Sequence, residues 1–298
     1  MPRIASPAWR IALAIVANIT ALLTIMLPFV LTGTLNFVLE NYGVQSVMNI
    51  VVGVIGTVVT FMIYRYVDRK PVRKLGFTFR RKDVLFSIGV LVLTLLNALV
   101  GLWFIQGVHS YITVQFDASR ILNGTYISLL LLAFVAWIIA SMQEEVLSRG
   151  YLLAQLQRLG LKNAILISSL LFLLVHIPFR GLHLYHAISI VMGGIVYAYM
   201  YLKSGSLWVS CVAHGIYDFV DAILFNVNDV SLFVLQDSIS MGDKLPYKIV
   251  LALCMLGFTY LIYGRNNGVM TPSENLQQLW GLRTLSATPT PSLEAQKL

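Results

Sequence analysis

Long apolar runs separated by short polar breaks are the main pattern of this chain. A helix that crosses a bilayer needs about 20 mainly apolar residues, because it rises about 1.5 Å per residue through a hydrocarbon core about 30 Å thick. The runs of this length predict spans at Trp9–Leu31, Val44–Tyr66, Val84–Val108, Tyr126–Arg149, Asn163–Ile177, His186–Leu202, Leu207–Phe225 and Tyr247–Tyr263. The predicted fold class is therefore all-α, a polytopic transmembrane helical bundle of about eight spans.

The polar breaks divide the chain into four segments. Residues 1–124 hold three predicted spans and a basic linker at 65–83, and residues 125–226 hold four spans with unusual polar residues. A loop and the last span follow at 227–264. Residues 265–298 are rich in Ser, Thr, Pro and Gln, which predicts a flexible polar tail.

Composition excludes a water-soluble domain. The chain is 58% hydrophobic and 11% charged, whereas soluble domains average about 45–50% apolar and about 25% charged residues. A disulfide scaffold is excluded as well, because only Cys211 and Cys254 are present and both lie in apolar runs where they fill space.

The net charge of +8 is concentrated in one place. The linker between the second and third spans carries Arg65, Arg69, Lys70, Arg73, Lys74, Arg80, Arg81 and Lys82. Such a cluster is typical of a cytoplasmic loop beside anionic lipid headgroups. We therefore expect a multi-pass protein of the cell membrane with a cytoplasmic N-terminus. The expected partner of the basic linker is the lipid bilayer, and no nucleic acid is expected to bind.

Carboxylates inside apolar helices mark the candidate chemistry. Between Arg120 and Asn228 the acidic residues are Glu144, Glu145, Asp218 and Asp221, all within predicted spans. Placing such a group at membrane depth costs about 2.5–3.5 kcal/mol, so it usually faces a cavity or a partner and serves a site. A purely structural reading stays open, in which a carboxylate and an arginine only lock two helices together.

The motif Glu144-Glu145-x-x-x-Arg149 divides the two glutamates between two roles. Glu145 and Arg149 are four residues apart, share a helix face and are predicted to form a structural ion pair. Glu144 is rotated by about 100° around the helix and is left free to act as a general base.

Two histidines are candidates to join Glu144. Glu144 lies 16 residues before Gly160 and His176 lies 16 after it, so a helical hairpin that turns at Gly160 brings them to the same height. This requires the fourth span to continue in more polar form to about Leu159.

His214 and Asp218 are four residues apart and point the same way, and Gly215 permits close approach of a neighbour. Counting from a turn near Gly205 places His214 roughly 10 Å below Glu144, a mismatch that helix tilt and the position of the turn can absorb. Asp221 is expected to be a hydrogen-bond partner on the same face.

Metal binding is a second possible use of these residues. His183 and His186 lie three apart near a helix start, and Glu144, His176, His214 and Asp218 are all competent zinc ligands. The chain has no His-Glu-x-x-His motif, the usual zinc-protease signature. We therefore expect no cofactor and no metal, with a zinc-dependent membrane protease as the alternative.

Three motifs, taken in order along the chain, resemble the CPBP family of CAAX proteases and bacteriocin-processing enzymes. They are Glu144-Glu145-x-x-x-Arg149, Phe172-x-x-x-His176 and His214-x-x-x-Asp218. These are also called Abi or type II CAAX prenyl endopeptidase-like proteins. The resemblance covers roughly residues 125–225. Ser148 stands where members often have an aromatic residue, and Asp218 stands where many have Asn.

The resemblance implies an intramembrane endopeptidase acting on a membrane-embedded or lipidated, CAAX-like protein. It implies that Glu144 and His176 activate a water and that His214 and Asp218 stabilise the oxyanion, and Asp in place of Asn leaves the oxyanion partner open. Two other functions stay in view: a non-catalytic binding or immunity protein on the same scaffold, and a proton-coupled transporter. A transporter predicts inverted repeats, and none is evident in the sequence.

Overall fold

The computed structural model describes residues 6–108, 114–116, 118–225, 230–235, 239–264 and 269–281. Within these residues, eight helices are long and apolar enough to cross a membrane. They span Pro7–Leu31, Tyr42–Val67, Arg81–Val108, Gly124–Leu159, Leu161–Pro178, Leu184–Ser204, Leu207–Phe225 and Met241–Gly264. The prediction of an all-α multi-pass membrane bundle is confirmed.

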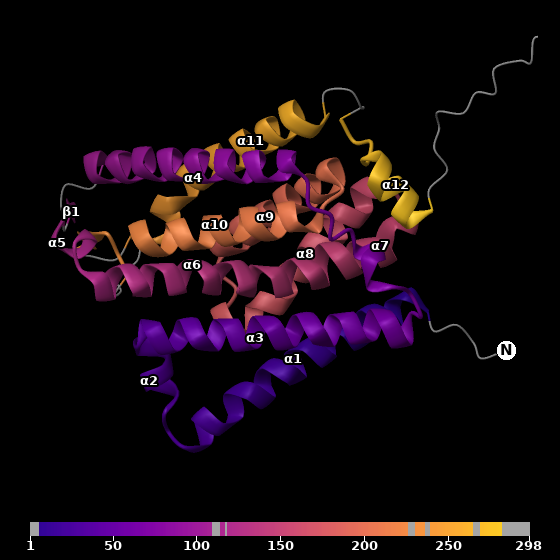
Figure 1. The fold of residues 1–298 in the computed structure, drawn as a ribbon, viewed down its shortest axis with the longest axis horizontal. Coiled ribbons are helices and arrows are strands. Elements are labelled where there is room, and N and C mark those ends of the chain that lie inside the picture. The colour runs from indigo at the N-terminus through magenta and orange to yellow at the C-terminus, as the bar shows by residue number, and fades with distance from the viewer. Residues whose placement is uncertain are drawn as a thin grey trace, which may run out of the picture.

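The long helices lie side by side as a bundle (Figure 1). The first three helices, α1 (Pro7–Leu31), the short α2 (Leu35–Glu40) and α3 (Tyr42–Met62), lie on one side, and α3 packs against α6 (Gly124–Glu145). A π-helical turn, η1 (Ile63–Val67), ends the second span.

The centre of the bundle is α10 (Leu207–Phe225), which packs against α6, α4 (Arg81–Val108) and α9 (Leu184–Ser204). In the most apolar stretch of α10, 72% of the residues are buried inside the protein, against 11% for α1. The remaining long helices are α8 (Leu161–Arg180), which packs on α9, and α11 (Met241–Thr259), which packs on α9 and α4 and ends in the π-helical η5 (Tyr260–Gly264). The helix that carries His214 and Asp218 is therefore held from several sides.

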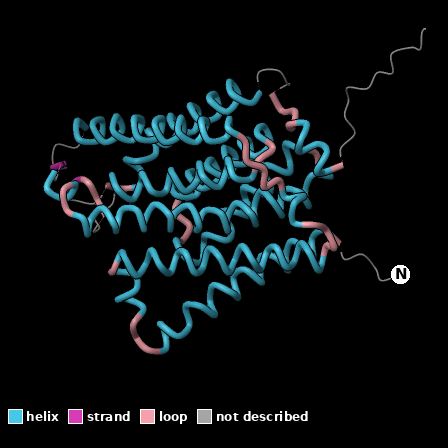
Figure 2. Tube along the Cα trace, viewed as in Figure 1, coloured by secondary structure: helices cyan, strands magenta, loops and turns pink. Residues whose placement is uncertain are grey.

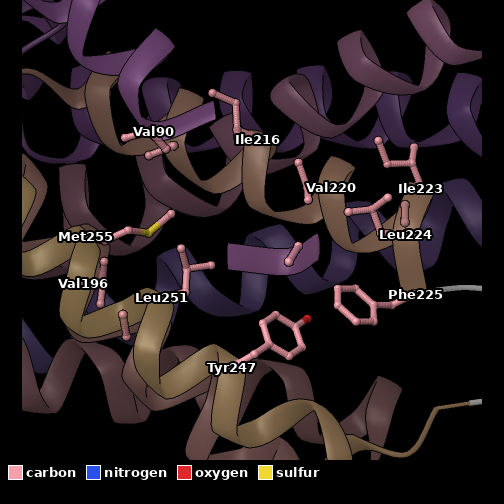
Figure 3. Close-up of a cluster of buried hydrophobic side chains, with 14 of the residues drawn as sticks. Val90, Val196, Ile216, Val220, Ile223, Leu224, Phe225, Tyr247, Leu251 and Met255 are labelled. Carbon is pink, nitrogen blue, oxygen red and sulfur yellow. The ribbon is translucent and has the colours of Figure 1, made fainter. Parts of the chain in front are cut away.

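The apolar core around α10 is drawn in Figure 3. Val220, Leu224 and Phe225 of α10 face Tyr247 and Leu251 of α11, and all five are buried. The rings of Phe225 and Tyr247 stack with centroids 4.6 Å apart. The ring stack joins the end of α10 to α11, which packs along its length on α9 and α4.

The fourth span continues to Leu159 as predicted, but it is not one regular α-helix. After α6 come the π-helical η3 (Val146–Leu152), α7 (Leu153–Leu156) and the 3-10 helix η4 (Gln157–Leu159). The chain turns at Gly160, whose φ of +81° suits glycine. Short π-helical segments are frequent at functional sites, and this one contains Arg149.

The last span begins at Met241, earlier than the predicted Tyr247. Ser240 caps this helix by accepting a hydrogen bond from the Asp243 backbone N–H. Lys244 and Lys248 then lie inside the protein and are 4% and 6% exposed. The sequence pattern hid this start because hydropathy treats a buried lysine and a loop lysine alike.

A small two-stranded ribbon closes one end of the bundle (Figure 2). The strand β1 (Val114–Phe116), close to the four-residue α5 (Ala118–Ile121), pairs antiparallel with β2 (Phe233–Leu235), with Phe116 opposite Phe233. Neither α2 nor the ribbon is predicted from hydropathy, since both are too short to give a periodic signal.

The opposite end gathers the start of α1, the basic linker and the turn after α9. Arg10 pairs with Asp68 at 2.8 Å, and the backbone N–H of Leu207 donates to Gly76 O at 2.9 Å, just after the 3-10 helix η2 (Val72–Leu75). The basic linker therefore lies beside the N-terminal end of α1.

Part of the predicted flexible tail is folded against this same end. Residues 274–280 form α12 (Glu274–Trp280), where Leu276 is fully buried and Asn275 Nδ2 donates to Gly205 O at 2.8 Å. The backbone N–H of Ser273 also donates to Leu202 O at 2.8 Å. The prediction of flexibility is wrong for this stretch because Leu276 and Trp280 supply apolar contacts that a composition argument averages away. Residues 265–268 and 282–298 lie outside the described residues.

Candidate active site

Glu145 is the last residue of α6 and is fully buried. Its Oε1 accepts a hydrogen bond from Arg149 Nη1 at 2.8 Å and lies 2.9 Å from His214 Nδ1. The ion pair expected from the four-residue spacing is present. The same oxygen also binds His214, which reasoning from the sequence did not foresee.

Arg149 is held on several sides and is only 1% exposed. Its Nη2 donates to Gly194 O at 3.1 Å, and its guanidinium carbon lies 4.5 Å from the centre of the Phe172 ring. A Cβ at position 194 would lie 2.8 Å from Ser169 Cβ, so glycine is needed for α9 to come this close to α8. Arg149 thus joins the fourth span to α8 and α9.

Glu144 faces two imidazoles. Its Oε2 lies 3.8 Å from His176 Nε2 and 3.8 Å from His214 Nε2. The Glu144 side chain is 35% exposed, against 0% for that of Glu145. Three spans therefore bring one carboxylate and two ring nitrogens to one point.

Hydrogen bonds orient both imidazoles. His176 Nδ1 lies 2.8 Å from Phe172 O, and because a carbonyl only accepts, this nitrogen carries a proton and donates it. His214 Nδ1 likewise faces the Glu145 carboxylate at 2.9 Å. Each ring therefore turns its Nε2 toward Glu144.

Asp218 lies on the other side of His214 Nε2. Its Oδ2 is 3.4 Å from that nitrogen and 3.5 Å from the Ser141 hydroxyl, which donates to it. Close packing of α10 against α6 makes this arrangement possible, since a Cβ at Gly215 would lie 2.7 Å from the backbone of Ile138.

Aromatic rings complete the surroundings of the histidines. The Tyr197 ring stacks on the His214 ring with centroids 4.4 Å apart, and Phe172 contacts His176 at 4.4 Å. Tyr197 and Ser141 were not singled out from the sequence. Tyr197 belongs to a run of alternating tyrosines in α9, and the spacing of that run does not show which one faces the site.

The structure brings together Glu144, His176, His214 and Asp218, with Glu145 and Arg149 behind them. The mismatch of about 10 Å that residue counting gives between His214 and Glu144 does not keep the two side chains apart, since they meet at 3.8 Å. Residue counts give heights only for regular helices whose turns lie at one level. The fourth span instead contains π-helical and 3-10 segments, which change the rise per residue.

The other histidines considered from the sequence lie in different surroundings. His183 is exposed, whereas His186 is 8% exposed and lines the cavity described next. Within the described part of the chain, no group of three or more His, Cys, Asp or Glu side chains is placed to hold a metal ion. His109 lies outside the described residues.

A cavity of about 130 Å³ opens from Glu144 toward α11. Its wall is mixed, and beside the site residues its lining includes Trp137, Ile190, Met192, Tyr217, Asp221, Met241, Lys248, Leu251 and Met255. The candidate catalytic groups therefore face a partly open cavity with both polar and apolar walls.

The chain was compared with protein-family models, curated proteins and solved structures. Residues 126–220 match the family model described as type II CAAX prenyl endopeptidase Rce1-like. No curated protein and no solved structure matches the chain. The match covers Glu144, His176, His214 and Asp218, the residues that meet at the cavity. This segment of the chain is therefore similar to the Rce1-like family of type II CAAX prenyl endopeptidases.

Proposed function

We propose that this protein is an intramembrane endopeptidase that hydrolyses a peptide bond in a membrane-embedded or lipidated, CAAX-like protein. The family match supports a CAAX-type membrane protease in general. The observation that carries the residue assignment is the position of Glu144 Oε2, 3.8 Å from Nε2 of both His176 and His214.

The proposed reaction starts with a water near Glu144 and His176. Glu144 takes one proton from this water while His176 Nε2, unprotonated because Nδ1 holds the proton, accepts the other hydrogen bond. The oxygen attacks the carbonyl carbon of the substrate and forms a tetrahedral intermediate. Of the two groups that orient the water, His176 is held by its hydrogen bond to Phe172 O.

His214 is the proposed oxyanion donor. In this role its Nδ1–H donates to Glu145 and its Nε2–H points at the developing negative charge. Asp218, 3.4 Å from the same Nε2, orients the ring when no substrate is bound. When the intermediate collapses, the C–N bond breaks and Glu144 returns its proton to the leaving amine, and the remaining proton of the new carboxyl group passes to that amine, which leaves a carboxylate and an ammonium as products.

The topology follows from the same reasoning. The start of α1 and the basic linker lie at one end of the bundle. We place that end in the cytoplasm, in the cell membrane. The proposed partners are the lipid bilayer and a membrane protein or lipidated peptide, with no nucleic acid and no cofactor.

The test uses purified protein in liposomes and a fluorescence-quenched peptide that carries an S-farnesyl cysteine followed by three apolar residues. Glu144→Gln keeps the shape of the side chain and removes the base, so we expect kcat to fall about 10²- to 10⁴-fold with an unchanged Tm. Glu40→Gln is the matched control, because Glu40 is exposed outside the cavity. Full activity of Glu144→Gln would reject the role assignment.

Two further measurements separate the rival functions. A strong chelator should leave the wild-type rate unchanged, and loss of activity that zinc restores would favour the metal-dependent alternative. A binding or immunity protein would bind the peptide without cleaving it. A transporter would instead show proton uptake that depends on Glu144.

A further inference from the structure

Two buried lysines meet one aspartate at the end of the cavity that lies toward α11. Asp221 of α10 lies 3.6 Å from Lys244 Nζ and 3.7 Å from Lys248 Nζ. The lysines are 4% and 6% exposed. Burying an ammonium group is costly unless it is paired, so this cluster holds one cation more than its carboxylate neutralises.

The two lysines differ in their surroundings. Lys244 Nζ lies 3.4 Å from Phe225 O and does not line the cavity. Lys248 does line it, and its ammonium group is hydrogen-bonded to the Tyr217 side chain and lies 4.0 Å from the weak acceptor Met241 Sδ. Its ammonium also lies 5.3 Å from the centre of the Tyr217 ring. Of the two ammonium groups, that of Lys248 is therefore the one at the cavity wall, with partners weaker than a close carboxylate.

Asp221 is already engaged on its other side. Its Oδ1 accepts a hydrogen bond from the Tyr247 hydroxyl at 2.8 Å. That bond and the pairing with Lys244 fix the carboxylate without Lys248. Asp221 therefore keeps Lys244 as a charge partner even when Lys248 binds another anion.

The distance from this cluster to His214 follows from the helix that carries both. His214 and Asp221 are seven residues apart in α10, which corresponds to about 10 Å along the axis and nearly the same helix face. An extended peptide advances about 3.3 Å per residue. About three residues therefore separate a peptide bond at His214 from a group at Lys248.

We propose that Lys248 binds the free C-terminal carboxylate of the substrate peptide. This proposal rests on the proposed function and deepens it. If Lys248 binds the C-terminal carboxylate, the distance from the C-terminus of the substrate determines which peptide bond is cleaved. The segment between the scissile bond and the carboxylate lies against Ile190, Leu251 and Met255, which line the same cavity and suit apolar side chains.

The first test measures binding without cleavage. It uses the Glu144→Gln protein and the farnesylated peptide in two forms, with a C-terminal carboxylate or a C-terminal amide. We expect the acid to bind about ten- to a hundredfold more tightly, the range for a hydrogen bond to a charged group. In Glu144→Gln with Lys248→Gln this preference should vanish, while Lys162→Gln, at an exposed lysine outside the cavity, should keep it. Equal binding of the acid and the amide by Glu144→Gln would overturn the proposal.

The second test measures cleavage. Lys248→Gln should raise KM for the acid about ten- to a hundredfold with little change in kcat, and should not change KM for the amide. Lys248→Arg, which keeps the charge, should recover part of the preference and also shows that the position tolerates substitution. A lower kcat for both peptides with equal KM values would mean that Lys248 is structural and would overturn the proposal.

A lipid phosphate is the competing anion. Binding of the acid peptide is therefore repeated in phosphatidylcholine vesicles with and without phosphatidylglycerol. A preference for the acid peptide in both kinds of vesicle supports the proposed carboxylate site. Loss of that preference only when phosphatidylglycerol is present assigns the site to a lipid phosphate and overturns the proposal.

The two proposals fail in different ways. If wild type cleaves neither peptide but Glu144→Gln still prefers the acid, the proposed function fails and the carboxylate subsite stands. If wild type cleaves acid and amide with the same KM, the endopeptidase stands and the subsite fails.

Discussion

Two buried charge clusters lie along the same face of α10, and they are built differently. In the first, Glu145 Oε1 lies 2.8 Å from Arg149 Nη1 and 2.9 Å from His214 Nδ1. In the second, Asp221 lies 3.6 and 3.7 Å from the ammonium groups of Lys244 and Lys248. The first has hydrogen-bond geometry and the second does not.

The cavity is lined both by an imidazole held in one orientation, that of His214, and by a lysine with longer contacts, Lys248. A short charge-assisted hydrogen bond holds an imidazole in one orientation, as a catalytic ring requires. A flexible lysine at a longer distance can turn its donors toward a ligand. Under the two proposals above, the Glu145 cluster is the scaffold for the proposed catalytic groups and the Asp221 cluster supports the proposed binding site.

Breaking the tight cluster should have the largest effect on stability. Glu145→Ala leaves the buried Arg149 without its carboxylate, which should lower the free energy of unfolding by about 3–5 kcal/mol. The measurement is denaturant unfolding in detergent. The double variant Glu145→Leu with Arg149→Leu is the control and should recover much of the loss, since no charge is then stranded. A change below about 1 kcal/mol in Glu145→Ala would contradict the comparison.

Breaking the loose cluster should cost less. Asp221→Asn leaves two ammonium groups without this carboxylate, but Lys248 faces a cavity where water can solvate it. We expect a loss of about 1–3 kcal/mol by the same assay. A loss as large as that of Glu145→Ala would show that both clusters are equally structural.

Removing the extra cation should have the smallest effect. Lys248→Gln leaves Asp221 paired with Lys244, so the free energy of unfolding should change by less than about 1 kcal/mol. Lys244→Gln is the matched comparison and should cost more, because it removes the lysine packed near Phe225 O. The reverse order would make Lys248 the structural lysine of the pair.

Much of the fold could be predicted from the sequence because hydropathy depends on composition over about 20 residues. The apolar runs predict all eight long helices, and glycine at 160 marks the turn after the fourth. Of the site, the sequence indicates the residues that the four-residue spacings select, namely Glu145 with Arg149 and His214 with Asp218. The equal residue counts on either side of Gly160 also predict the meeting of Glu144 and His176, which lie 3.8 Å apart.

Other features depend on contacts between helices distant in sequence. The bond from His214 to Glu145 joins residues 69 apart, and spacing along either helix gives no sign of it. The stacking of Tyr197 on His214 depends on how α9 is rotated against α10. The early start of α11 depends on Lys244 and Lys248 finding a carboxylate inside the bundle.

The sequence by itself determined a membrane bundle and the chemical types of its polar residues, because both are local properties of composition and helical period. Only the tertiary structure decided which polar groups share one cavity, since that depends on the rotation and depth of each helix against its neighbours. The same packing separated two buried charge clusters with different geometry, one that fixes an imidazole and one that leaves a lysine at the cavity wall.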